Sequence, residues 1–185
     1  MKDIFGENRR PLSNFGGFYE LTPIAASDWK SGVRERLARD DCTIDAVAMR
    51  RLIELGELHP RSTMLIAQQT HLASIFAQIR EIDANLVEAG FQAARQRDRG
   101  KHEQTIDRIR KLRGKATGRR ALRVARSIAR DEALYTERGA DAEVGRSVAA
   151  LRDAGLVEPK SEGRGWRIAD PLFRHYVAEL GPARV

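Results

Sequence analysis

The sequence predicts a mainly α-helical protein with one small β-hairpin near its C-terminus. Apolar residues recur at helical spacing along most of the chain, and one segment contains two short strand patterns around a glycine-containing turn. Hydrophobic residues make up 42% of the chain and aromatic residues 6%, which suits helical cores of Leu, Ile, Val and Ala. A length of 185 residues allows one domain or two small ones.

The first part of the C-terminal pattern is a helix with a clear end. Val144, Val148 and Leu151 are spaced to lie on one apolar face. Gly155 follows where a left-handed residue would end the helix, and Leu156 is placed for the apolar contact that accompanies such an end.

The second part is a hairpin and a final helix. Strands are expected at residues 156–158 and 166–168, joined by a turn with two glycines. Asp170 is expected to cap the final helix, with Pro171 in its first position. With the helix that precedes it, this order predicts a winged helix-turn-helix domain with a small β-wing over residues 101–185.

Residues 25–100 are expected to form a helical bundle of four helices with short connections. Ser27 is expected to cap the first helix, and the second should run from Ile44 to Gly56. Pro60 should begin the third, and Asp83 should cap the fourth, with Ile82 and Val87 as a hydrophobic staple. The apolar face of the third helix is expected to contain Met64, Ala67, His71, Ile75 and Ile79.

Residues 1–24 show neither the bundle pattern of residues 25–100 nor the winged-helix pattern of residues 101–185. A single strand pattern, Phe18–Leu21, has no second long strand nearby, and an unpaired strand is unstable by itself. We expect this segment to be the remnant edge of an α/β core. Its exposed aromatic side chains would favour association, so a homo-oligomer is one expected form.

The net charge of +7 is concentrated in the middle of the chain. Residues 91–130 hold 14 Lys or Arg against 3 Asp or Glu, a net charge of +11, so the other 145 residues sum to −4. Such a block is typical of a surface for a phosphate backbone or an acidic partner, and equally of a solvated helical face.

Candidate DNA contacts follow from this block and from the hairpin. Acidic residues at the start of the helix before the hairpin disfavour base reading, so contact with the DNA backbone at low sequence specificity is expected. One stripe at helical spacing and four further cations form the candidate set: Arg119, Arg123, Arg126, Arg130, Arg146, Lys160, Arg164 and Arg167.

The order of several short motifs resembles the C-terminal half of a P-loop ATPase of the AAA+/STAND group, near the archaeal-type ATPases. These motifs are FYELTPI, a helical bundle, GELHPR, an Arg-rich link and GRGWRIADPLFRHYV. The resemblance implies that Arg61, beside His59, occupies the second-sensor position over the nucleotide phosphates. It also makes Arg10 a candidate inter-subunit finger.

The sequence departs from that family at the phosphate site. No G-x-x-x-x-G-K-[ST] loop occurs, and no apolar strand ends in paired acids for magnesium. We therefore expect no catalytic residues and no ATPase activity from this chain alone. ATP and Mg would bind only with a P-loop ATPase core supplied in cis or in trans, whether the chain is a truncation, a split gene product or a degenerate relative.

Other function classes are disfavoured by composition. No apolar run approaches the length of a membrane span, and a single cysteine, Cys42, excludes an internal disulfide. Four scattered histidines suggest no zinc site, and a cytoplasmic location is expected. Three hypotheses remain: a lid and winged-helix portion that couples nucleotide state to DNA or protein contacts, a DNA-binding regulator without nucleotide, and a protein-interaction module.

Overall fold

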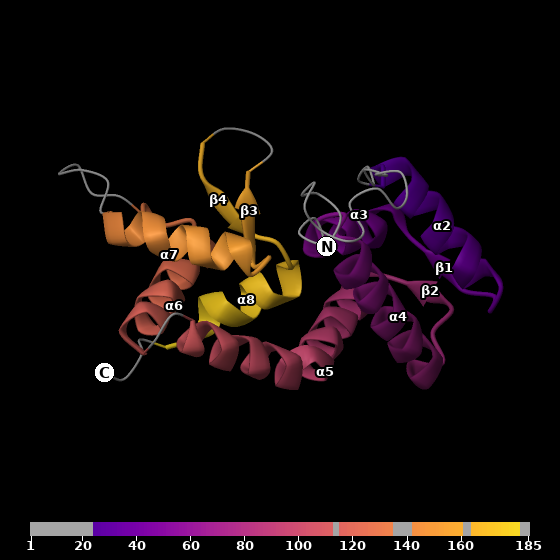
Figure 1. The fold of residues 1–185 in the computed structure, drawn as a ribbon. Helices are drawn as coiled ribbons and strands as arrows, with labels where there is room; N and C mark the ends of the chain where they lie inside the picture. Colours follow the sequence, from indigo (N-terminus) through magenta and orange to yellow (C-terminus); the bar gives the residue numbers. More distant parts are fainter. Residues whose placement is uncertain (1–23, 113–114, 135–141, 161–163, 182–185) are drawn as a thin grey trace, which may run out of the picture.

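The computed structural model describes residues 24–112, 115–134, 142–160 and 164–181. The expected strand at residues 18–21 and the candidate Arg10 lie outside these ranges. Within them the protein is mainly α-helical with short strand pairs, as the sequence predicts (Figure 1). The elements are α2 (Ala26–Ala38), β1 (Thr43–Ile44), α3 (Ala46–Gly56), α4 (Pro60–Ala77), β2 (Glu81–Ile82), α5 (Ala84–Lys111), α6 (Lys115–Ala129), α7 (Ala142–Asp153), β3 (Val157–Pro159), β4 (Trp166–Ile168) and α8 (Pro171–Glu179).

Helix starts in the bundle follow local sequence, with two corrections. The Asp83 carboxylate accepts from the Leu86 amide, and Ile82 and Val87 are both buried, so the predicted cap is confirmed. The prediction for Ser27 is wrong, because α2 begins after Ala25 without a side-chain cap. Ile44 was expected in a helix and instead lies in β1.

The strand β1 pairs in parallel with β2, with Thr43 opposite Glu81 and Ile44 opposite Ile82. Each strand has two residues and directly precedes the N-cap of a helix, Asp45 for α3 and Asp83 for α5. This short ladder therefore holds the N-termini of α3 and α5 together.

The predicted apolar face of α4 holds only in the first half of the helix: Met64 and Ala67 pack against the hydrophobic core, whereas Ile75 and Ile79 are exposed. The buried residues of α4 are small or polar for the most part, and they are Ser62, Thr63, Ile66, Thr70 and Ser74. Glycines allow this close packing, since a Cβ at Gly90 would lie 2.2 Å from Thr70 Oγ1 and one at Gly56 would lie 2.3 Å from Thr63 Oγ1. Where α4 approaches its neighbouring helices this closely, only small side chains fit between the backbones. Ile75 and Phe76 stay exposed.

The helix α5 is continuous across the expected boundary at residue 100. It has 28 residues, and Ile106 lies in its second half. Figure 1 shows that α5 changes direction along its length, so its first half packs in the bundle and its second half with the C-terminal elements.

The C-terminal elements follow the predicted order of helix, helix, hairpin and helix. Gly155 has φ +70°, and the antiparallel strands β3 and β4 pair Val157 with Ile168. The Asp170 carboxylate caps α8 by accepting from the amides of Leu172 and Phe173. Gly118 lies inside α6, where a Cβ would be 2.1 Å from the Arg110 carbonyl oxygen.

Two hydrophobic cores share the helices α5 and α8. The first core lies among α2, α3, α4 and α5, and the second among the end of α5, α6, α7, the hairpin and α8. In α8, Leu172 packs in the first core, whereas Phe173 and Val177 pack in the second. As a result, α8 joins the bundle to the C-terminal elements. Among the described helices, none is long and apolar enough to cross a membrane.

Candidate functional site

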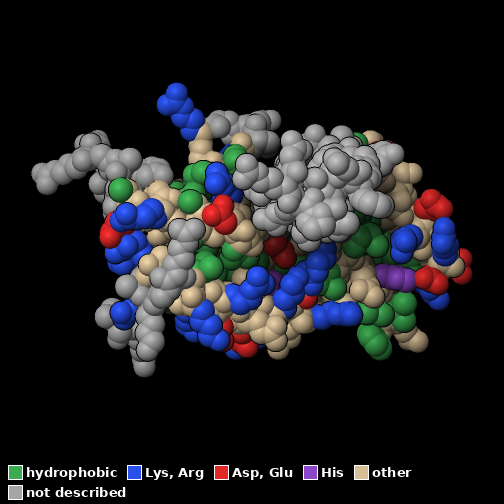
Figure 2. Space-filling view, viewed as in Figure 1, with side chains coloured by type: hydrophobic (Ala, Val, Ile, Leu, Met, Phe, Trp, Pro, Cys, Tyr) green, Lys and Arg blue, Asp and Glu red, His purple; other side chains and the backbone are tan. Residues whose placement is uncertain are grey.

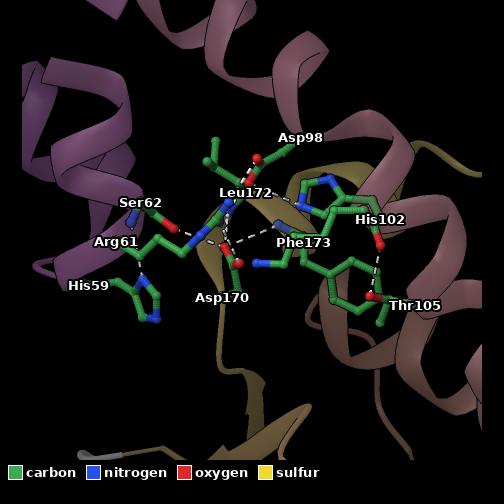
Figure 3. Close-up of polar contacts among 10 residues, drawn as sticks. His59, Arg61, Ser62, Asp98, His102, Thr105, Asp170, Leu172 and Phe173 are labelled. Carbon is green, nitrogen blue, oxygen red and sulfur yellow. Dashed lines mark hydrogen bonds and ion pairs between the residues drawn. The ribbon is translucent and has the colours of Figure 1, made fainter. Parts of the chain in front are cut away.

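The strongest polar cluster lies where α4, α5 and the start of α8 meet (Figure 3). Arg61, in the first turn of α4, donates from Nη2 to Asp98 Oδ1 at 2.8 Å, and its Nη1 lies 2.6 Å from Asp98 Oδ2. One hydrogen bond and one close charge contact thus form the ion pair, and Asp98 Oδ2 has no hydrogen-bond partner among the described residues. Asp98 is almost fully buried on α5, while Arg61 remains partly exposed.

The same guanidinium reaches the N-cap of α8. Arg61 Nη1 lies 3.6 Å from Asp170 Oδ2, and the Ser62 hydroxyl donates to Asp170 Oδ1 at 2.9 Å. Asp170 therefore receives contacts from α4 while it caps α8. Arg61, Ser62, Asp98 and Asp170, called the Arg61 cluster below, connect three helices from both cores.

His102 extends this cluster into the protein interior. It is 2% exposed, one turn after Asp98, and its ring lies between Phe173 and Tyr176 with centroid distances of 5.5 and 5.3 Å. Its Nε2 is 3.9 Å from Asp98 Oδ2, which is too long for a hydrogen bond. Neither ring nitrogen has a hydrogen-bond partner within the described part of the chain.

The electrostatics of the cluster have clear causes. Burial raises the pKa of Asp98, but the hydrogen bond and charge of Arg61 outweigh burial, so the net pKa lies below its ordinary value. The hydrogen bond to Asp98 raises the pKa of Arg61. Burial lowers the pKa of His102, despite the opposing charges of Asp170 and Asp98. At neutral pH the cluster thus holds a charged pair beside a neutral imidazole.

His59 has a structural contact in this position. Its Nδ1 accepts from the Ser62 amide at 3.2 Å, which makes it the N-cap of α4. Arg61 and His59, which were predicted to sense nucleotide, thus both lie at the start of α4. Arg61 forms ion pairs with two acids, whereas His59 accepts a backbone hydrogen bond.

A cleft of about 720 Å³ opens beside Arg61, between α2, α4 and α5. Val33, Leu37 and Met64 contribute apolar walls. The charged groups that line it are Arg36, Arg39, Asp40, Arg61, His71, Arg97 and Asp98. His71, expected on an apolar face, is partly buried with Nε2 3.3 Å from Asp40 Oδ2.

The predicted DNA-contacting stripe on α6 is divided by the fold. Arg126 donates to the Leu180 carbonyl at 2.8 Å, and Arg130 donates to the carbonyls of Ala178 and Leu180. These two side chains satisfy carbonyls at the C-terminal end of α8. Arg119 and Arg123 are exposed and form no ion pair with the described residues.

The cations near the hairpin are mostly paired. Arg146 lies 3.8 Å from Glu143, Lys160 lies 2.8 Å from Asp131, and Arg167 lies 2.8 Å from Glu158. Arg164 is exposed and has no ion pair among the described residues. The structure thus does not bring the eight candidate DNA contacts together as one free surface.

Sequence reasoning missed Asp98 and His102. Both continue the apolar face of α5 that Phe91, Ala94 and Ile106 mark at helical spacing. A carboxylate on a buried face requires a cationic partner, and this signal could have directed attention to Arg61. Within the described ranges, no group of three or more His, Cys, Asp or Glu residues could hold a metal ion.

Comparison with known proteins adds no family to these observations. No protein-family model matches the chain, and no curated protein or solved structure matches it significantly.

Proposed function

We propose that this chain is the lid and winged-helix portion of an AAA+/STAND-like P-loop ATPase, and that it couples nucleotide state to the position of its C-terminal elements. The observation that carries the proposal is the contact of Arg61 with both Asp98 and Asp170. One guanidinium at a helix start links the bundle to the cap of α8.

The coupling follows from competition for that guanidinium. A triphosphate held by a P-loop core in cis or in trans offers oxygens with the same bidentate geometry as a carboxylate. When Arg61 turns to the phosphates, Asp98 and Asp170 lose a cation and the link to α8 weakens. The P-loop core supplies the remaining phosphate and Mg contacts, for which this sequence has no loop.

The test measures hydrogen exchange at the start of α8 in the full chain during titration with MgATP. Because Arg61 acts without a P-loop, we expect affinity in the millimolar range, about −4 kcal/mol, and no ATP turnover. Exchange at the amides of Leu172 and Phe173, which bond Asp170, should rise with ATP.

The matched variants are Arg61→Gln, which should abolish the response, and Arg99→Gln, which removes an exposed cation of α5 and should preserve it. An equal response in the Arg61→Gln variant, or no response at 10 mM ATP, about −2.7 kcal/mol, would contradict the proposal. Binding of MgATP at micromolar concentration would show that the nucleotide site is complete without a P-loop core. That outcome would also contradict the proposal.

DNA binding without nucleotide is the second candidate function. It is favoured by exposed cations of α5 and α6 that have no ion pair with the described residues. This candidate does not involve Arg61, so the two functions can be tested independently.

A further inference from the structure

The outer side of the second half of α5 carries cations that form no ion pair with the described residues. Lys101, Arg108 and Lys111 lie at i, i+7 and i+10, and all three are exposed. This spacing places them on one side of a helix over about 15 Å. They are called the α5 stripe below.

The acids of this helix half have other partners. Glu103 pairs with Arg99 at 3.0 Å, and Asp107 pairs with Arg110 at 3.1 Å. Among the described residues, none forms an ion pair with a member of the α5 stripe. The acids of this helix half are thus neutralised by cations that do not belong to the α5 stripe.

The helix α6 adds two exposed cations near the end of α5. Gly118 lies against the Arg110 carbonyl, so Arg119 follows directly after the point where α6 contacts the end of α5. Arg119 and Arg123 are exposed one turn apart. Figure 2 shows Lys and Arg side chains in a band over α5 and the region beside it.

We propose that the α5 stripe, with Arg119 and Arg123, is a docking surface for the phosphate backbone of double-stranded DNA. This inference deepens the second candidate function by naming its surface. It moves the contact from the hairpin, where the cations are mostly paired, to the junction of α5 and α6. Five cations without ion pairs on two rigid helices can contact phosphates without first breaking an ion pair.

Other polyanions fit this surface less well. A helix that binds anionic membranes carries an apolar face beside its cations. Among the described residues, α5 and α6 have no exposed large apolar side chain. Single-strand binding uses exposed aromatic platforms, and the described part of α5 and α6 offers none. Duplex RNA is recognised through phosphate and 2′-hydroxyl contacts, so the competition experiment below separates it from duplex DNA.

The experiment is fluorescence anisotropy of the full chain on two unrelated 20-base-pair DNA duplexes between about 50 and 200 mM salt. In the stripe variant Lys101→Gln/Arg108→Gln/Lys111→Gln, the slope of log affinity against log salt should fall by about 2.7, or 0.9 per lost phosphate contact. Affinity at the lowest salt should fall about 10- to 100-fold. The charge-preserving variant Lys101→Arg/Arg108→Lys/Lys111→Arg should bind like the wild type.

The matched control is Arg99→Gln/Arg110→Gln/Arg152→Gln, which removes the same charge from cations that already have acidic neighbours. For this control, the slope of log affinity against log salt should change by less than about one. An equal loss in this control would overturn the docking surface in favour of non-local charge. An unchanged slope in the stripe variant would contradict the docking surface but not DNA binding itself. If the wild type does not bind either duplex at the lowest salt, both the docking surface and DNA binding are contradicted.

Competition identifies the partner. Unlabelled duplex DNA should displace the probe at lower concentration than single-stranded DNA, duplex RNA or phosphatidylserine vesicles, compared per phosphate. More effective displacement by any of these three would overturn the assignment to double-stranded DNA. Circular dichroism of each variant should show unchanged helix content, since the substituted side chains are exposed.

Discussion

At the residue scale, the main feature is a buried carboxylate that depends on one guanidinium. Asp98 is 8% exposed, and Arg61 makes two contacts to it. A buried ion pair contributes little net stability, yet removal of one partner leaves an uncompensated charge. The cluster is therefore sensitive to single substitutions in a way that exposed pairs of this protein are not.

The substitution Arg61→Ala should lower the free energy of unfolding by about 2 kcal/mol, less than a fully buried pair would lose because the guanidinium is partly exposed. Asp98→Asn should cost less, and the double variant should recover part of the loss. Urea denaturation measures all three. The control Arg99→Ala breaks an exposed pair and should change stability by less than about 0.5 kcal/mol. Equal effects at Arg61 and Arg99 would mean that Asp98 is not dependent on Arg61.

His102 should make the fold less stable in mild acid. Burial lowers its pKa in the folded state below the ordinary value near 6.5, so the unfolded state binds more protons as pH falls through that range. Stability is therefore full above the unfolded pKa and is lost as pH decreases. Asp98 acts in a different window, because its lowered pKa affects stability only below about 3.8.

The measurement is the urea midpoint between about pH 7 and 5 for the wild type and His102→Leu. The variant should lose less stability across this range. Asp98, Asp170, Lys101 and Arg61 also act on this imidazole, and their net effect is included in the wild-type curve. His175, whose pKa burial also lowers, should account for part of the remaining slope. Parallel curves for wild type and variant would exclude His102 as a source of the pH dependence.

At the element scale, small residues decide how closely α4 and α5 pack. The contact between Gly90 and Thr70 leaves no space for a Cβ, and burial of Thr70 and Ser74 follows from this approach. Three larger apolar residues of α4, Leu72, Ile75 and Phe76, are then exposed.

Two glycines of the same helix provide a matched comparison. Gly90→Ala should destabilise the protein by about 2–3 kcal/mol, because the methyl group would meet Thr70 backbone and side-chain atoms within 2.6 Å. Gly100→Ala should stabilise it by about 0.5–1 kcal/mol, since nothing lies within 4 Å of its Cβ position and alanine favours helix. Thermal unfolding monitored by circular dichroism measures both. A neutral Gly90→Ala variant would contradict the close approach of α4 and α5.

At the scale of the whole molecule, α8 unites two cores that the sequence places in separate segments. Leu172 packs with the bundle, while Phe173 and Val177 pack with the C-terminal elements. The continuous α5 and the Arg61 cluster reinforce this connection. We therefore expect the two parts to unfold together.

The two tryptophans report the two parts separately. Trp29 is buried in the first core, and Trp166 packs against the second. The variants Trp29→Phe and Trp166→Phe each keep one tryptophan. In each variant, the unfolding midpoint measured by tryptophan fluorescence should equal the midpoint measured by circular dichroism. Leu172→Ala should lower the stability of both by about 2–4 kcal/mol. A fluorescence midpoint that departs from the circular dichroism midpoint would show that the cores unfold independently.

The sequence alone determined features whose causes are local. The caps at Asp83 and Asp170, the left-handed Gly155 and the hairpin follow from neighbouring residues, and the structure confirms each. The tertiary structure decided the face that α4 buries, the β1–β2 pairing, the separation of paired from free cations and the Asp98 partner of Arg61. These depend on backbone approach and charge contacts between residues far apart in the chain, which no local pattern encodes. Arg61 and Asp98, for instance, are 37 positions apart, and the packing of α4 against α5 brings their charges together.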